Sequence, residues 1–224
     1  MSTELAAQLR TFGFVHLRNC AASLIEQLEG EFEGLIGVEE GERPEERVTV
    51  RGVMDDMPAL ARLAALPLVT SLCDGFFGTA HHVITSDLNL LVGDSYWHSD
   101  GFYGTPFLRF VGYMEPLNGD NGALRFLPGS QTTDSGWQGE ATRDVMKHET
   151  QLGVSGADLP AAVVETEPGD VVVFDTNVLH SAWNGTCRRQ FAFNVVGAPN
   201  GPQALHDTTR YFLNRYTQGT VLLT

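Results

Sequence analysis

The spacing of apolar residues predicts helices in the first third of the chain. Apolar positions recur every three or four residues over 22–35 and 57–77, which is the period of an amphipathic helix. Residues 3–9 predict a shorter opening helix, and residues 12–17 predict a first strand. Residues 38–51 are acidic and polar, so we interpret them as a solvated loop.

From residue 81 onward, the pattern changes to short apolar segments separated by turns. Glycine, proline, asparagine and aspartate cluster between these segments, most densely at residues 118–122 and 168–170. This spacing favours a β-sandwich or a closed jelly roll. The predicted strands lie within residues 82–92, 107–114, 123–127, 162–166, 171–174 and 190–196.

Two segments of the second half depart from this strand pattern. Residues 131–160 are polar and poorly patterned, which is typical of a lid or a binding loop. Residues 207–216 predict a final helix.

Length and composition indicate a globular protein, and we assign residues 1–224 to a single domain. The net charge of −14 argues against a nucleic-acid partner, which would require a basic surface. No apolar run approaches the ~20 residues of a membrane span, and the first residues lack the features of a signal peptide. Three widely spaced cysteines (Cys20, Cys73 and Cys187) argue against a disulfide framework. We therefore expect a cytoplasmic protein with no membrane partner.

Three residues carry the strongest chemical signal. His98 and Asp100 form a His-x-Asp pattern, and alternate residues of a strand point to the same face. His180 follows a distant apolar segment and is placed to complete the set. Two imidazoles and one carboxylate on one face of a metal leave the other positions open, as in non-heme iron(II) oxygenases. The alternatives are a polar strand end for His98 and Asp100 and a hydrogen-bonded core histidine for His180.

Four segments together resemble the phytanoyl-CoA dioxygenase family of Fe(II)/2-oxoglutarate-dependent oxygenases. The segment Trp97–Asp100 is close to the metal motif of the ectoine hydroxylases, and Gln131 stands where the family commonly has histidine. The resemblance covers most of the chain. Its segments are residues 12–18, 97–100, 121–130 and 169–180, the last followed by Arg188 and Arg189.

The resemblance implies a mainly β protein, a double-stranded β-helix (jelly roll, cupin-like) with N-terminal helices packed on one side. It implies Fe(II), 2-oxoglutarate and O₂ as cofactor and co-substrates, with His98, Asp100 and His180 as the iron ligands. The expected reaction is hydroxylation of a C–H bond in a small organic molecule, with release of succinate and CO₂. In relatives that halogenate, glycine or alanine replaces the aspartate, so Asp100 favours hydroxylation.

The resemblance also implies that an arginine shortly after the distal histidine binds the far carboxylate of 2-oxoglutarate. Arg188 and Arg189 compete for this role, because strand alternation lets only one of them face inward. With Arg189 inward, Phe191, Phe193 and Val195 would share its face as an apolar pocket lining. We therefore predict Arg189 and keep Arg188 as the alternative.

Other residues are weaker candidates for the pocket. Asn89 matches an asparagine that contacts 2-oxoglutarate in ectoine-hydroxylase-like members, although a strand-edge amide is an alternative. Aromatic residues near the metal motifs could line a substrate pocket or simply pack, and Arg109 could anchor an anionic group. The substrate-pocket candidates are Trp97, Phe102, Tyr103, Arg109 and Trp183.

Two rival functions remain at this stage, and both keep the jelly roll. A cupin-like metal-dependent isomerase or hydrolase would bind a metal but ignore 2-oxoglutarate. A non-catalytic small-molecule-binding jelly roll would bind without turnover. In each case the expected partner is a small molecule. The sequence leaves open the substrate, the oligomeric state, and desaturation, epimerisation or cyclisation in place of hydroxylation.

Overall fold

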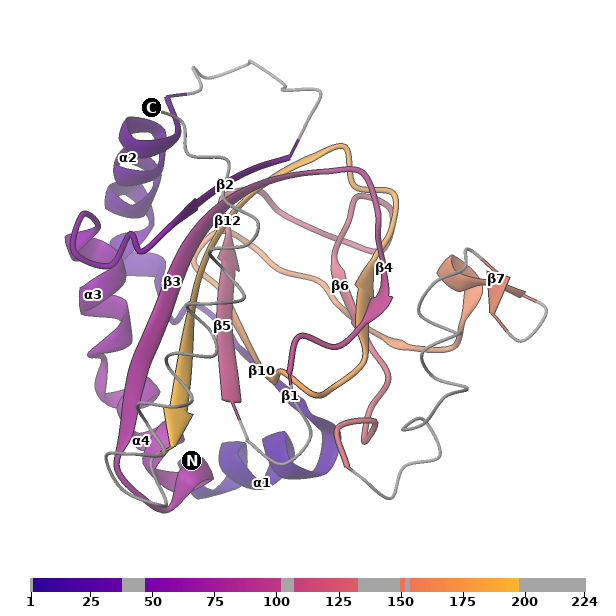
Figure 1. Ribbon diagram of the computed structural model, residues 1–224, viewed down its shortest axis with the longest axis horizontal. Helices are drawn as coiled ribbons and strands as arrows, with labels where there is room; N and C mark the ends of the chain where they lie inside the picture. The colour runs from indigo at the N-terminus through magenta and orange to yellow at the C-terminus, as the bar shows by residue number, and fades with distance from the viewer. Residues whose placement is uncertain (1, 38–46, 102–106, 133–149, 152–153, 198–224) are drawn as a thin grey trace.

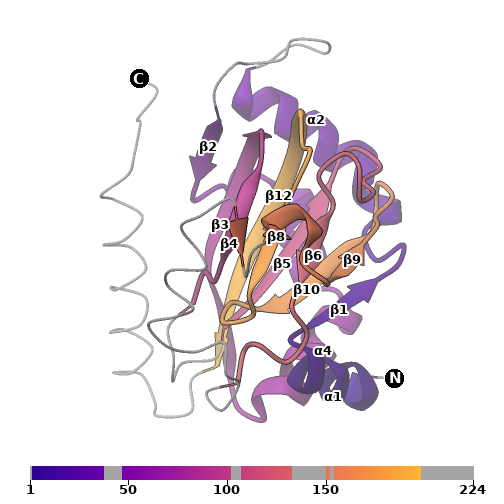
Figure 2. The same cartoon turned by 90° about the vertical axis from the view of Figure 1, so that its right-hand side faces the viewer.

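The computed structural model describes residues 2–37, 47–101, 107–132, 150–151 and 154–197 (Figure 1). Two antiparallel sheets face each other and form a jelly roll. Figure 2 looks onto the small sheet, with strands of the large sheet behind it. The mainly β fold expected from the sequence is therefore confirmed.

The large sheet has six strands and the small sheet has four. The large sheet has the order β1 (Phe14–Leu17), β10 (Val171–Asp175), β5 (Phe107–Tyr113), β12 (Cys187–Gly197), β3 (His81–Val92) and β2 (Val48–Arg51). The small sheet has the order β4 (Ser95–His98), β11 (His180–Ala182), β6 (Leu124–Phe126) and β9 (Ala162–Val164). A separate hairpin joins β7 (Thr150–Gln151) and β8 (Val154–Ser155).

Helices cover one face of the large sheet, as the resemblance implied (Figure 1). Their apolar sides form one buried cluster with that face of the sheet. The helices are α1 (Ser2–Phe12), α2 (Ile25–Ile36), α3 (Pro58–Ala64) and α4 (Pro67–Phe77), with short 3₁₀ turns η1 (Ala22–Leu24) and η2 (Gly156–Asp158).

Strand alternation divides the buried residues of β12 between two layers. Phe191 and Phe193 point to the helices and belong to the helix-side cluster. Ala192 points the other way, into a second cluster between the sheets that also contains Phe126 and Phe174. A third, smaller cluster that includes Trp97 belongs to neither of these layers. The large sheet thus has two faces of different character, one packed on the helices and one facing the small sheet.

The structure corrects two expectations about the elements. The helix expected over residues 57–77 is two helices, because Leu66 has extended backbone angles (φ −60°, ψ 139°) before Pro67. Part of the loop expected over residues 38–51 is the strand β2, whereas residues 38–46 lie outside the described ranges. The final helix expected over residues 207–216 and much of the expected lid loop also lie outside them.

No single helix in the described ranges is long and apolar enough to cross a membrane. The bent pair α3 and α4 meets the criterion together, on length and composition alone.

Candidate active site

The two histidines of the predicted metal motif lie directly opposite each other in the small sheet. His98 ends β4 and His180 begins β11, and the antiparallel register pairs these two residues. Their ring centroids are 4.3 Å apart. The ring of His180 also packs against Phe174 and Phe126, so its position is fixed by the core between the sheets.

Asp100 reaches the same point from just beyond the end of β4. Its backbone N–H and that of Gly101 both donate to the carbonyl of Thr176, at 2.8 and 2.7 Å. Asp100 lies 3.7 Å from Nε2 of His98 through one oxygen and 3.6 Å from Nε2 of His180 through the other. Ligand atoms of the triad (His98, Asp100 and His180) all lie within 4.8 Å of one another. The sequence prediction that these three residues meet is confirmed.

Backbone carbonyls fix which nitrogen of each imidazole faces the triad. Nδ1 of His98 lies 2.6 Å from the carbonyl of Tyr96, and Nδ1 of His180 lies 3.0 Å from that of Val178. A carbonyl only accepts, so each Nδ1 carries a proton and donates it. In the neutral ring, each Nε2 then has a lone pair directed at the triad, which is the state in which histidine binds a metal.

The charges of the triad favour a carboxylate with a neutral imidazole. Burial and the neighbouring His180 lower the pKa of His98. Burial alone would raise the pKa of Asp100, but the hydrogen bond and charge of His180, with His98 and Arg109, outweigh it and lower the pKa. When they are neutral, the two imidazoles offer two nitrogen donors beside one anionic oxygen donor, a set that fits iron(II).

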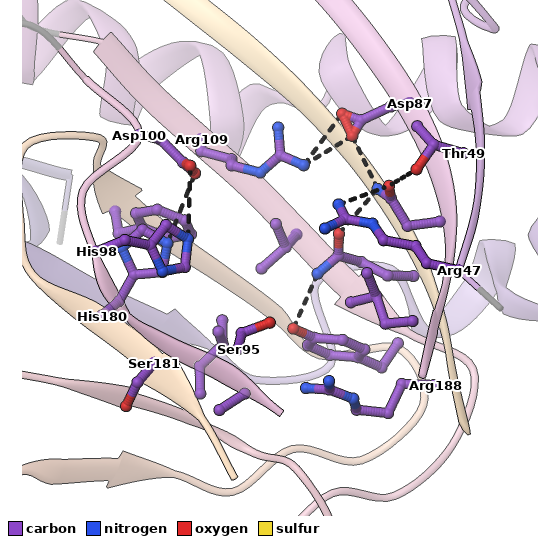
Figure 3. A pocket seen from close by; sticks show the side chains of 18 of the residues that line it. Arg47, Thr49, Asp87, Ser95, His98, Asp100, Arg109, His180, Ser181 and Arg188 are labelled. Atoms are coloured by element: carbon purple, nitrogen blue, oxygen red, sulfur yellow. Dashed lines mark hydrogen bonds and ion pairs between the residues drawn. The ribbon is translucent and has the colours of Figure 1, made fainter. Parts of the chain in front are cut away.

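A pocket of about 170 Å³ opens beside the triad, between the two sheets (Figure 3). The large sheet supplies most of its polar wall. The pocket is lined by the triad together with Arg47, Thr49, Arg51, Asp87, Asn89, Leu91, Ser95, Arg109, Val111, Tyr113, Leu124, Phe174, Ser181, Ala182, Arg188 and Gln190.

Arg188 lines the pocket, and the prediction that Arg189 faces inward is wrong. Arg188 is 1% exposed and donates to the carbonyls of Gly122 and Gly93, at 3.0 and 2.7 Å. Arg189 points to the helix side, where its guanidinium forms ion pairs with three carboxylates. These carboxylates belong to Glu29, Glu33 and Glu115.

The error arose from the apolar residues that share a face with Arg189. Phe191 and Phe193 do share its face, but they pack under the helices and not in the pocket. The opposite face holds Gln190 and Arg188, and these polar side chains line the pocket. On β12, the more apolar face is therefore the one that packs against the helices.

Two glycines make room for the guanidinium of Arg188. A Cβ at Gly185 would lie 2.6 Å from Nε of Arg188, and a Cβ at Gly122 would lie 2.7 Å from its Cδ. Nε of Arg188 is buried and has no hydrogen-bond partner within the described part of the chain. The close backbone approach holds the guanidinium in one place while part of its donor capacity stays unused.

Asn89 lies in the pocket, in a network that links four strands. Its amide nitrogen donates to Asp87 at 2.9 Å and to Gln190 at 3.1 Å. Its oxygen accepts from Thr49 at 2.8 Å, and Gln190 in turn donates to the hydroxyl of Tyr113 at 2.9 Å. Burial raises the pKa of Tyr113, so its hydroxyl stays protonated. The network fixes the polar wall of the pocket.

The aromatic candidates for the substrate pocket are not borne out where the structure describes them. Trp97 and Trp183 are buried in the cluster that also contains Leu159, and they are absent from the pocket lining. Trp97 donates to the carbonyl of Gly156 at 2.9 Å, which is a packing role. Phe102 and Tyr103 lie outside the described residues.

Arg109 does line the pocket, as the sequence suggested. Its guanidinium donates to both oxygens of Asp87, at 3.0 and 2.7 Å. The sequence reading missed the residues of β2, although Val48 and Val50 alternate there with Thr49 and Arg51. This period of two is the signal that would have revealed the strand and its pocket-facing side.

Comparison with protein families bears out the resemblance seen in the sequence. The model of the phytanoyl-CoA dioxygenase family matches residues 9–190, a span that includes the triad and Arg188. No curated protein matches the sequence.

Solved structures of low sequence identity share the fold. The α-ketoglutarate-dependent epimerase SnoN from nogalamycin biosynthesis superposes with a TM-score of 0.66 and 19% identity, over 88% of this chain and 83% of that chain. EctD from S. alaskensis with bound Fe gives 0.64 and 20%, over 87% and 76%. AviO1 from Streptomyces viridochromogenes Tue57 gives 0.65 and 20%, over 90% and 97%. At these identities, the likeness establishes the jelly roll and not the reaction.

Proposed function

Because the chain belongs to the phytanoyl-CoA dioxygenase family, we propose that it hydroxylates a C–H bond of a small organic molecule. Family membership places it among the iron(II)- and 2-oxoglutarate-dependent oxygenases and gives iron(II), 2-oxoglutarate and O₂ as its cofactor and co-substrates. The reaction type and the role of each residue are the parts that we propose.

The triad would hold the iron. Both Nε2 atoms and the Asp100 carboxylate converge on one point, and the carbonyl contacts of both Nδ1 atoms prevent the rings from turning. This convergence is the observation that carries the proposal. An iron ion held by these three ligands would keep its other positions open to further ligands.

Arg188 would bind the far carboxylate of 2-oxoglutarate. It lines the same pocket as the triad, it is buried, and its planar guanidinium suits a carboxylate. Asn89, in the same pocket, is a second candidate contact, as the sequence suggested. The ion pairs of Arg189 with Glu29 and Glu115 on the helix side support the choice of Arg188 over Arg189.

Iron(II) with 2-oxoglutarate and O₂ supplies an oxidant strong enough to attack an unactivated C–H bond, with release of succinate and CO₂. The contribution of the protein is to hold the reactants in place and to restrict water. His180 is 4% exposed and its ring packs against Phe174, so the His180 side of the site is apolar. With Asp100 as a ligand, the iron would have no vacant protein-ligand position for halide, which favours hydroxylation over halogenation.

The proposal is tested with the protein free of O₂. Fe(II) and 2-oxoglutarate together are expected to give a weak visible charge-transfer band in the wild type and none in His98→Ala. The matched control is His82→Ala, because His82 is exposed and lies outside the pocket; this variant is expected to keep the band.

Admission of O₂ then tests turnover. Release of succinate that depends on the triad, together with a product heavier by one oxygen atom, would support hydroxylation. A product of unchanged composition would instead indicate an epimerase. Metal binding without any response to 2-oxoglutarate would overturn the proposal in favour of a cupin-like isomerase or hydrolase.

A further inference from the structure

The charges that line the pocket are opposite in sign to the charge of the chain. The sequence has 14 lysines and arginines against 28 aspartates and glutamates. The charged side chains that line the pocket are nevertheless four arginines and two aspartates: Arg47, Arg51, Arg109, Arg188, Asp87 and Asp100. Since the local field acts on a ligand inside a pocket, this excess of arginine favours an anionic ligand.

Several of these charges are already matched. Arg109 is paired with Asp87 at 2.7 Å. In the proposed function, the two carboxylates of 2-oxoglutarate match the two charges of iron(II), and Arg188 matches Asp100. The arginines of the β2 segment are positive charges beyond those that the cofactor and co-substrate require.

Arg47 is the clearest of these. It directly precedes β2, and with Thr49 and Arg51 it occupies alternate positions that all line the pocket. Arg51 makes further contacts of its own, so Arg47 is the better candidate to bind a ligand. Among the described residues, Arg47 makes one hydrogen bond, to the amide oxygen of Asn89 at 3.3 Å, and no ion pair. Figure 3 shows its guanidinium pointing into the pocket, across from the triad.

The surroundings of Arg47 suit an anion. Partial desolvation lowers the pKa of Arg47, although the residue stays exposed to solvent. The carboxylates of Asp87 and Asp100 raise this pKa, and the guanidinium groups of Arg109 and Arg51 lower it. A guanidinium that lines a pocket and has one neutral partner among the described residues gains most from a carboxylate or a phosphate, which accepts two parallel hydrogen bonds. The hydroxyl of Thr49 also donates to the oxygen of Asn89, at 2.8 Å, and so fixes the group that accepts the hydrogen bond of Arg47.

We propose that the substrate carries an anionic group, a carboxylate or a phosphate, and that Arg47 binds this group opposite the triad. This inference rests on the proposed function, because that function assigns Arg188 and the triad to 2-oxoglutarate and iron. Arg47 is thereby a specificity-determining residue, since a neutral substrate would leave its charge without a partner in the pocket.

The test uses Mn(II) in place of iron, so that no turnover occurs. Full-length protein saturated with Mn(II) and 2-oxoglutarate is mixed with butyrate or with its neutral isostere butyramide. Proton relaxation of each probe by the bound Mn(II) reports its occupancy near the metal. Inorganic phosphate, followed by its phosphorus relaxation, forms a second arm that separates phosphate from carboxylate recognition.

We expect butyrate or phosphate to bind about tenfold more tightly than butyramide, as one charge-assisted pair predicts. Arg47→Gln should remove this preference while the affinity for 2-oxoglutarate stays within about twofold. The control Arg62→Gln makes the same change of charge on an exposed position of α3 and should keep the preference.

Equal relaxation by butyrate and butyramide in the wild type, together with no phosphate effect, would overturn the inference. The same holds if Arg47→Gln leaves the preference intact, or if it weakens only 2-oxoglutarate, which would make Arg47 a co-substrate residue. If Mn(II) and 2-oxoglutarate do not bind the wild type together, the proposed function itself fails. That result is distinguishable from the others because it precedes the addition of any probe.

Discussion

The matched pair Arg188→Gln and Arg189→Gln tests the assignment of the co-substrate arginine. The two residues are neighbours on β12 and lose the same charge, but they point to opposite faces of the sheet. Arg188 is 1% exposed and lines the pocket. The side chain of Arg189 is 25% exposed and lies among glutamates.

The expected loss for Arg188→Gln follows from its burial. Truncation of one partner in a buried, hydrogen-bonded charge pair costs about 2–5 kcal/mol. Even the lower value corresponds to a dissociation constant for 2-oxoglutarate that rises by about 30-fold. Arg188→Lys keeps the charge but loses the planar fork, so an intermediate loss is expected.

Arg189→Gln should instead affect stability. Its partners are between 31% and 46% exposed, and exposed ion pairs contribute about 0–1 kcal/mol each. The free energy of unfolding should therefore fall by about 1–2 kcal/mol. The affinity for 2-oxoglutarate should not change.

The assay is an anaerobic titration of the Fe(II)-loaded protein with 2-oxoglutarate, paired with urea unfolding of each variant. Unfolding curves separate a loss of binding from a loss of folded protein. A 30-fold weakening in Arg189→Gln with a normal Arg188→Gln would refute the assignment. Equal weakening in both would show that neither side chain is the specific contact.

Three further predictions follow from individual contacts. Gly185→Ala should raise the dissociation constant for 2-oxoglutarate by about tenfold, because the added Cβ would lie 2.7 Å from Cζ of Arg188. In the control Gly34→Ala, in α2, the added Cβ meets no atom within 4 Å, so the dissociation constant should not change. Burial raises the pKa of Asp175 to about 6, so the wild type should lose up to about 3 kcal/mol of unfolding free energy as the pH rises from about 4 to 7. Asp175→Asn should flatten this dependence in urea melts, and an unchanged slope would contradict the burial argument. Mn(II) and 2-oxoglutarate, each at about 100 times its dissociation constant, should raise the melting temperature by about 5–10 °C in calorimetry. Asp100→Asn should abolish this rise, and an equal rise in that variant would argue against Asp100 as a ligand.

Much of the fold was predictable because most strands are apolar segments bounded by turn residues. The period of two is local information, so the sequence alone located seven strands of the two sheets. The break between α3 and α4 was also local, at Pro67, and should have been predicted from the extended conformation that proline imposes on Leu66.

The triad was predictable because His98 and Asp100 lie two residues apart and His180 stands in a motif of its own. The choice between Arg188 and Arg189 was different, since it depends on which face of β12 the helices cover. That is a tertiary property, and alternation alone gives two faces without saying which one is the pocket. Phe191 and Phe193 mark the face of β12 that packs on the helices, but we predicted from the sequence that this face lines the pocket.

The role of Arg47 could not be predicted from the sequence for a similar reason. It lies beside an acidic stretch, and the net charge of the chain gives no sign of a pocket rich in arginine. Only the pairing of β2 with β3 brings Arg47 to Asn89 and to the same cavity as the triad.

The most direct test of the central claim is a crystal structure of the protein with Mn(II) and 2-oxoglutarate. We expect Mn(II) to be bound by Nε2 of His98, Nε2 of His180 and the carboxylate of Asp100, with the far carboxylate of 2-oxoglutarate on Arg188. A metal held by other residues, or a far carboxylate bound by Arg47 or Arg109 in place of Arg188, would contradict it.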